Sequence, residues 1–183
     1  MTCIGNNGHK GFSLMELLVV IALIGILSGI AFYSVGDMRA RYGVEKTIKD
    51  LYTDLMNARV LAMQENRSSF VVFAPNQYVV YKDGTAAMEG NGALEVAADT
   101  KVQTKDIDAA YTLAYPAEWT GVDVFQFTGK GLVPKNVTDP PKGTNGIATI
   151  SVTTTATAEY DCLLISQIKL TLGKMNGPNC AGK

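Results

Sequence analysis

The chain lacks most of the residues from which catalytic sites are built. Its one histidine, His9, precedes a long apolar run, and no imidazole follows it in the 183-residue sequence. The body of the chain therefore has no histidine to act as general base, proton shuttle or metal ligand. A nucleotide-binding glycine loop is also missing, because Gly129-Lys130-Gly131-Leu132 does not have the required spacing. We expect a protein that is not an enzyme and has no catalytic, cofactor-binding or metal-binding residues.

The chain also lacks an excess of charge of one sign. Its formal net charge is -1, which gives no reason to expect nucleic acid or anionic lipid as a broad electrostatic partner. Lys169, Lys174 and Lys183 are the cations nearest the C-terminus, and Glu159 and Asp161 lie close to them in the sequence. Direct binding of DNA is therefore a disfavoured alternative.

Cysteine is scarce and unevenly placed. Cys3 precedes the apolar run, whereas Cys162 and Cys180 lie near the C-terminus. No close Cys-Xaa-Xaa-Cys spacing of a zinc or redox site is present. Outside the cytoplasm, the pair Cys162 and Cys180 predicts a disulfide that closes a loop of about 19 residues and stabilises the fold by roughly 3 kcal/mol. Two buried free thiols are the alternative.

A long uncharged run extends from Leu17 to Val35. As a helix it is roughly 28 Å long, enough to span the hydrocarbon core of a bilayer. It is not a typical secretory signal, since no small-residue cleavage site follows it. Glu16, at its start, is an ionisable group at membrane depth and requires a partner or a function. The run itself contains no cation that could neutralise it.

The segment around Glu16 carries a specific motif. Lys10-Gly-Phe-Ser-Leu-Met-Glu-Leu-Leu-Val-Val-Ile21 closely resembles the processing signal of type IV prepilins and type II secretion pseudopilins. The resemblance implies that prepilin peptidase cuts between Gly11 and Phe12 and that the new amine of Phe12 is methylated. It also implies that Glu16 attracts the N-terminal amine of the neighbouring subunit in a filament. A role for Glu16 as an anchor near the membrane surface is the alternative.

The physical chemistry of this pairing agrees with the resemblance. A carboxylate and an ammonium each lose several kcal/mol of solvation on leaving water, so a filament core that pairs them favours one register of subunit addition. The implied partners are prepilin peptidase, other pilin or pseudopilin subunits and the inner membrane, with an assembly platform or a secreted substrate as further possibilities. The glycines of the run, Gly25 and Gly29, offer places for close helix packing.

The sequence after the run predicts a second, amphipathic stretch of the same helix, which extends from about Ser13 to Glu65. Apolar residues recur at intervals of three and four, and charged residues occupy the other side, where we expect them to be solvated. We divide the chain into a leader (1–11), a transmembrane and assembly helix (12–36), an amphipathic helix (37–66) and a globular β-rich domain (67–183). The apolar positions are Val44, Ile48, Leu51, Leu55, Ala58 and Ala62.

Residues 67–183 predict a small, mainly antiparallel β-sheet. With the long helix packed against this sheet, the predicted fold class is α+β, as in pilins. Two β-branched and aromatic runs separated by Pro75-Asn76 predict a hairpin, and residues 83–110 predict a loop-rich insertion. The predicted strands are Ser68–Phe73, Gln77–Lys82, Tyr111–Tyr115, Val122–Phe127, Ile147–Thr153 and Cys162–Leu172.

Some details resemble the GspH/FimT subgroup of minor pseudopilins. They are the helix end at Tyr52–Arg67, the aromatic and glycine turn of Phe125–Gly131, and the later strands Ile147–Thr153 and Leu163–Leu172. The pair Cys162 and Cys180 departs from many members of that subgroup and is similar instead to the C-terminal disulfide loop of larger type IV pilins.

The resemblance thus implies a structural subunit, a minor pseudopilin, of a type II secretion pseudopilus or a type IV pilus. A major type IV pilin and a pilus-tip subunit that binds a surface or DNA are the alternatives. The implied location is the bacterial inner membrane, with a single span and the C-terminal domain in the periplasm, before incorporation into a filament. We expect no cofactor; Asp139 and Asn145 offer oxygen ligands for calcium, but a simple turn beside Lys142 is the favoured interpretation.

Overall fold

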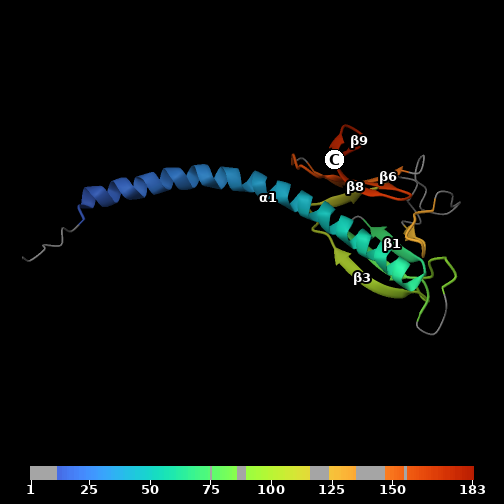
Figure 1. The fold of residues 1–183 in the computed structure, drawn as a ribbon. Coiled ribbons are helices and arrows are strands. Elements are labelled where there is room, and N and C mark those ends of the chain that lie inside the picture. Colours follow the sequence, from blue (N-terminus) through green and yellow to red (C-terminus); the bar gives the residue numbers. More distant parts are fainter. Residues whose placement is uncertain (1–11, 75, 86–89, 116–123, 135–146, 155) are drawn as a thin grey trace, which may run out of the picture. The chain divides into compact units, whose positions relative to one another are not determined.

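One long helix and nine strands make up the part of the chain that the structure describes. This computed structural model describes residues 12–74, 76–85, 90–115, 124–134, 147–154 and 156–183, with the backbone alone for 31–34. The α+β class and the long N-terminal helix are confirmed (Figure 1). The elements are α1 (Leu14–Glu65), β1 (Ser69–Ala74), β2 (Gln77–Lys82), β3 (Thr100–Asp106), β4 (Thr112–Ala114), β5 (Val124–Phe127), β6 (Ile147–Thr153), β7 (Cys162–Ser166), β8 (Leu170–Asn176) and β9 (Asn179–Gly182).

The chain divides into two compact units. The first is Met1–Arg39 and the second is Ala40–Lys183, so α1 contributes its apolar half to the first and its amphipathic half to the second. Each unit is described separately below.

The amphipathic half of α1 forms one wall of the hydrophobic core of the second unit. The six apolar positions predicted from the sequence are all buried, with exposed fractions of 0 to 2%. Side chains of the strands complete the core, among them Phe73, Phe125, Ile150 and Leu163. The helix ends at Glu65, and the next residue, Asn66, adopts the left-handed conformation with φ of 51° that is common after a helix C-terminus.

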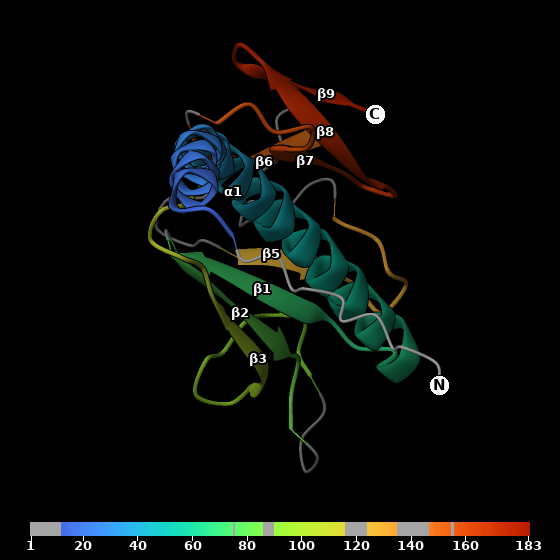
Figure 2. The same cartoon turned by 90° about the vertical axis from the view of Figure 1, so that its left-hand side faces the viewer.

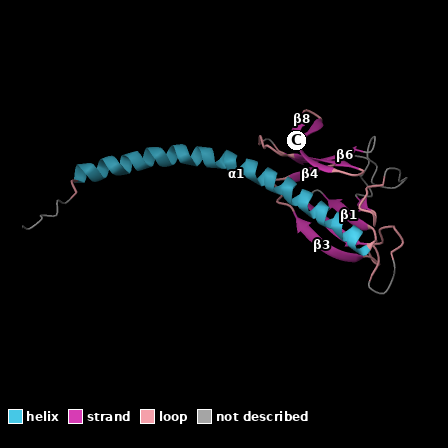
Figure 3. Cartoon of the chain, viewed as in Figure 1, coloured by secondary structure: helices cyan, strands magenta, loops and turns pink. Residues whose placement is uncertain are grey.

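The strands form two antiparallel sheets rather than the single sheet predicted. The first has the order β3-β2-β1-β5 and the second has the order β4-β6-β7-β8-β9. Figure 2 shows these sheets along two flanks of the second half of α1, and Figure 3 shows the same strands in magenta. The predicted hairpin is confirmed, since β1 and β2 pair in register from Ser69 opposite Lys82 to Ala74 opposite Gln77.

The strands differ from the prediction in three places. The segment predicted as a loop-rich insertion contains β3, a largely exposed strand that pairs with β2 and so belongs to a sheet edge. The single strand predicted over Cys162–Leu172 is two strands, because Ser166 Oγ donates to the carbonyl oxygen of Lys169 at 2.8 Å and closes a turn between β7 and β8. Strand β9 was not predicted, and it pairs with β8 at the C-terminus.

The polar side of α1, predicted to be solvated, makes hydrogen bonds to the rest of the domain. The carboxylate of Asp54 accepts a hydrogen bond of 2.6 Å from Tyr78 Oη. Burial of the Tyr78 hydroxyl, and then its bond to Asp54, raise the pKa of Tyr78 above its usual range. Arg59 Nη1 donates to the carbonyl oxygen of Ile168 at 2.8 Å, which links the helix to the second sheet.

Glu45 makes a further link between α1 and the second sheet. Its carboxylate accepts from Lys49 Nζ at 2.9 Å, one helical turn away, and from the backbone N–H of Glu159 at 3.0 Å. The bond from Lys49, followed by the bond from Glu159, lowers the pKa of Glu45. The helix is therefore fixed to both sheets by polar contacts as well as by its apolar face.

Candidate assembly site

The candidate site begins at Phe12, the first residue that the structure describes. Its side chain is 81% exposed. The N–H of Leu17 donates to the carbonyl oxygen of Ser13 at 3.1 Å, so the helix is formed from this point. Glu16 lies in the first turn of α1, where a negative charge is favoured by the positive end of the helix dipole. Gly11, the other residue of the predicted cleavage site, lies outside the described residues.

The apolar half of α1 is exposed on every side within this chain. The consecutive residues Leu17, Leu18, Val19, Val20 and Ile21 are 43 to 60% exposed, and five successive positions cover all faces of a helix. This differs from the second half of α1, where an apolar stripe from Val44 to Ala62 is buried in the core. A helix that is apolar all round requires lipid or other helices as its surroundings.

The same segment meets the length and composition of a membrane span. Among the described residues, α1 is the one helix with a sufficiently long window of high hydropathy and low charge, and none of that window is buried. The window therefore takes no part in the hydrophobic core of the described chain. A span of this kind is consistent with membrane anchoring.

Glu16 has no cation within reach along its own helix. The first lysine or arginine after it in the sequence is Arg39, which is 23 residues further along α1 and thus roughly 35 Å away by helical rise. Lys10, before it, lies outside the described residues. A partner for the carboxylate in an apolar environment must then come from the N-terminal side of the chain or from another molecule.

The surface of this half-helix has open places at its glycines. A Cβ atom added at Gly25 or Gly29 would meet nothing within 4 Å beyond the adjoining backbone of its own helix. Such positions allow the backbone of a neighbouring helix to approach closely, as small residues do in membrane helix pairs.

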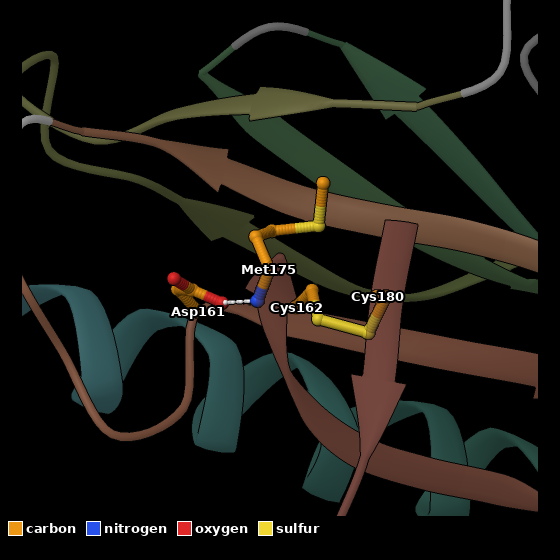
Figure 4. Close-up of a disulfide and its surroundings, with 4 residues drawn as sticks. All are labelled: Asp161, Cys162, Met175 and Cys180. Atoms are coloured by element: carbon orange, nitrogen blue, oxygen red, sulfur yellow. Dashed lines mark hydrogen bonds between the residues drawn. A yellow bond between two sulfur atoms is a disulfide. The ribbon is translucent and has the colours of Figure 1, made fainter. Parts of the chain in front are cut away.

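The C-terminal cysteines are joined in the second unit. Cys162 in β7 and Cys180 in β9 form a disulfide with an S–S distance of 2.00 Å and a Cα–Cα distance of 6.1 Å (Figure 4). These strands lie on opposite sides of β8. The disulfide crosses β8 at Gly173, where an added Cβ would lie 2.7 Å from the sulfur of Cys180. A glycine is therefore required beneath the disulfide.

Further contacts hold the residues around the disulfide. The backbone N–H of Met175 donates to the carboxylate of Asp161 at 2.6 Å, as Figure 4 shows. The last residue, Lys183, has its ammonium 3.3 Å from the carboxylate of Glu159 and 5.4 Å from the centre of the Tyr160 ring. Because Lys183 is paired in this way, it contributes little to the basic patch on which the DNA-binding alternative depends.

The structure leaves the calcium alternative untested. Asp139 and Asn145 both lie outside the described residues. Among the residues that the structure describes, no three histidine, cysteine, aspartate or glutamate side chains gather closely enough to hold a metal ion.

Comparison with known proteins supports the interpretation of the N-terminus. Residues 6–32 match the family described as "Prokaryotic N-terminal methylation motif". Two proteins of Pseudomonas aeruginosa, each named "Fimbrial protein", are 30% identical to the chain over 92 residues. These matches support assignment to the type IV pilin and pseudopilin family. The aligned region is 49% of this chain and 59% of each fimbrial protein, and no solved structure matches the chain.

The pilin-like assignment leaves part of the second unit unaccounted for. The alignment and the methylation motif do not assign a role to the loops at the C-terminal end of α1, where described residues from five stretches of the chain line an open cleft. Sequence analysis missed this cleft, because its lining residues are far apart in the chain and follow no spacing. Gly129, before Lys130, and the Gly-Asn-Gly of 90–92 lie in its walls.

Proposed function

We propose that the chain is a structural subunit of a type IV pilus or a type II secretion pseudopilus. Prepilin peptidase cleaves it after Gly11, the new amine of Phe12 is methylated, and the apolar half of α1 anchors it in the bacterial inner membrane. The C-terminal domain lies in the periplasm until the subunit enters a filament. The observation that carries this proposal is the exposed apolar stretch of α1 from Leu14 to Ile30, whose one acid, Glu16, lies within the matched methylation motif.

Assembly in this proposal depends on the exchange of lipid for neighbouring helices around α1. Glu16 then pairs with the N-terminal amine of an adjacent subunit, an amine that exists at Phe12 only after cleavage. The pairing favours one register because a carboxylate left alone in the apolar core would lose several kcal/mol of solvation without compensation. Cleavage thereby acts as the switch from membrane storage to assembly, and other pilin or pseudopilin subunits are the partners.

We favour a minor pseudopilin, on the GspH/FimT-like pattern of its helix end and strands. A major pilin is the second candidate, and the disulfide between Cys162 and Cys180 favours it, since it is similar to the C-terminal disulfide loop of larger type IV pilins. The abundance of the chain in sheared filaments separates the two. A minor subunit is scarce in that fraction relative to the major protein, whereas a major pilin dominates it.

The test of assembly compares Glu16→Ala with Val19→Ala in the native host. Both variants keep the cleavage site, and Val19 is an exposed apolar residue of the same segment, 54% exposed, without charge. Glu16→Ala is expected to be cleaved normally and to enter sheared filaments poorly, whereas Val19→Ala enters like the wild type. Equal incorporation of both variants would show that the charge pair is dispensable. A Gly11→Ala variant that is still fully processed would count against the prepilin interpretation.

A further inference from the structure

The two cysteines of the Cys162–Cys180 disulfide occupy unequal places in the second sheet. Cys162 lies in β7, which has β6 on one side and β8 on the other, whereas Cys180 lies in β9 at the edge of the sheet. Cys162 is completely buried, and Cys180 is partly exposed. A reagent from solution therefore meets the two sulfurs under different conditions.

The backbone around Cys162 is fixed on both sides. Its Cα pairs with that of Ser151 in β6 and with that of Gly173 in β8. The preceding residue, Asp161, donates its N–H to the carbonyl oxygen of Gly173 at 3.2 Å, and its carboxylate accepts from the N–H of Met175 at 2.6 Å. The thiol of Cys162 becomes exposed only when β6, β7 and β8 separate, which is close to global unfolding of the domain.

Strand β9 is held much less firmly. Among the described strands it pairs with β8 alone, from Asn179 opposite Asn176 to Gly182 opposite Gly173. Its side chains are those of asparagine, cysteine and alanine, with a glycine at the end, and three of its four residues are exposed. Little apolar surface is buried when it pairs, so we expect β9 to open at a low free energy while the rest of the domain stays folded.

The contacts at the end of β9 lie at the surface and are equally easy to break. The N–H of Lys183 donates to the carbonyl oxygen of Leu172 at 3.0 Å, and its ammonium lies 3.3 Å from the carboxylate of Glu159. Both side chains of this ion pair are largely exposed, and such pairs add little stability. The turn between β8 and β9, where Gly177 has φ of 62°, is the hinge for this opening.

The path between the two sulfurs is open when β9 is paired. Gly173 lies beneath the disulfide, and a Cβ at this position would be 2.7 Å from the sulfur of Cys180. The Cα atoms of the two cysteines are 6.1 Å apart. A thiol on Cys180 therefore returns to within bonding range of Cys162 each time β9 pairs with β8.

We propose that external thiol–disulfide exchange reaches this disulfide through Cys180. During formation, the Cys180 thiolate attacks a small disulfide such as oxidised glutathione, so that a mixed disulfide forms on Cys180 and one glutathione thiolate leaves. The Cys162 thiolate then attacks the sulfur of Cys180, and the second glutathione thiolate leaves. The chain gives up two electrons and two thiol protons, and oxidised glutathione becomes two reduced molecules. This assignment does not depend on the assembly role of α1.

Reduction follows the same steps in reverse. The thiolate of reduced glutathione attacks the sulfur of Cys180, and Cys162 leaves as a thiolate. A second glutathione thiolate then releases Cys180 as a thiolate, and oxidised glutathione forms. In both directions Cys180 carries the mixed disulfide and Cys162 reacts only with Cys180.

The first test measures the alkylation of both thiols in one molecule, the reduced full chain in detergent micelles. The background substitution Cys3→Ser removes the third thiol, and trypsin places the other two on separate peptides, because Lys169 and Lys174 lie between them. N-ethylmaleimide labelling, quenched at intervals and read by mass spectrometry, is expected to be at least about a hundredfold faster at Cys180 than at Cys162. Urea below the unfolding transition should accelerate labelling of Cys162 steeply and that of Cys180 only slightly, because only Cys162 requires most of the domain surface to be exposed.

The second test uses a matched pair of variants in the same background. Cys162→Ala keeps the thiol of Cys180, and Cys180→Ala keeps the thiol of Cys162. The first is expected to form a mixed disulfide with oxidised glutathione at least about a hundredfold faster than the second. In urea that unfolds both variants the two rates should become similar, which shows that the difference comes from the fold.

Three results would overturn the proposal. They are similar labelling rates at the two cysteines of the folded reduced chain, the same urea dependence at both, and faster mixed-disulfide formation in Cys180→Ala than in Cys162→Ala. Circular dichroism checks the folding of each form. If reduction unfolds the domain, the oxidised chain decides: brief exposure to reduced glutathione and an acid quench should leave glutathione on Cys180, and glutathione on Cys162 would contradict the assignment.

Discussion

Reduction of the Cys162–Cys180 disulfide is expected to lower the free energy of unfolding of the C-terminal domain by about 3 kcal/mol. The two cysteines are 18 positions apart, and the chain-entropy estimate for a loop of that size gives this value. The native contacts of β9 persist without the bond, because β9 pairs with β8 and the N–H of Lys183 donates to the carbonyl oxygen of Leu172 at 3.0 Å. The loss therefore arises mainly in the unfolded chain, which gains freedom.

The assay compares the oxidised and reduced forms of the wild-type chain, which differ in this bond alone within the described residues. Thermal unfolding in micelles, followed by circular dichroism, is expected to show a midpoint lower by roughly 10 °C after reduction. In the double variant Cys162→Ala/Cys180→Ala the thermal midpoint should be lowered at least as much, because Cys162 is completely buried and its sulfur also fills core space. A change in unfolding free energy of less than about 1 kcal/mol on reduction would refute the loop-entropy reasoning.

Three further predictions concern the stability of the second unit. Gly129→Ala is expected to destabilise the domain by about 1–3 kcal/mol, because the added Cβ would lie 2.8 Å from the backbone of Asn66. The control is Gly25→Ala, whose added Cβ has open space around it and is expected to leave the thermal midpoint unchanged. Leu55→Ala removes a fully buried side chain of α1 and should lower the unfolding free energy by about 2–5 kcal/mol in urea titration; a loss under about 1 kcal/mol would contradict the core described here. The free energy of unfolding should fall as pH rises above about 10. In the folded domain the raised pKa of Tyr78 keeps its hydroxyl protonated, whereas in the unfolded chain the same hydroxyl ionises at its ordinary pKa. Tyr78→Phe should reduce that fall and also lose the bond to Asp54, and an unchanged pH profile would argue against the burial of this hydroxyl.

Local periodicity was enough to predict α1 and its buried face. The recurrence of Val44, Ile48, Leu51 and Leu55 at intervals of four and three can only describe one face of a helix, and all four are completely buried. The hairpin of β1 and β2 could also be predicted from local sequence, because both strands are rich in β-branched and aromatic residues and a turn separates them.

The missed strands have little local signal. In β3, Val102 is the only large apolar residue among threonines, lysines, a glutamine and an aspartate, and the strand forms because β2 supplies its hydrogen-bonding partner. Strand β9 is short and composed of small residues, and its place depends on pairing with β8 and on the disulfide. The turn between β7 and β8 is closed by the hydrogen bond from Ser166 Oγ to the carbonyl oxygen of Lys169. The mainly apolar sequence around it predicts one continuous strand and gives no sign of this turn.

The candidate sites divide in the same way. The assembly segment is continuous in the chain, so the motif from Lys10 to Ile21 suffices to single out Phe12 and Glu16 from sequence, and their roles stay predictions. The cleft at the C-terminal end of α1 combines residues as far apart in the sequence as Asn66 and Gln167, and only the tertiary fold brings them together.

The mass of the N-terminus of the assembled protein tests the central claim most directly. Peptide mass spectrometry of the chain recovered from sheared filaments, or from the inner membrane for a minor subunit, is expected to find a mature chain that begins with N-methylated Phe12. The same preparation from a strain without prepilin peptidase should contain the precursor that begins at Met1. A wild-type filament fraction in which the chain retains residues 1–11 would contradict the account, because the amine that Glu16 is proposed to pair with would not exist.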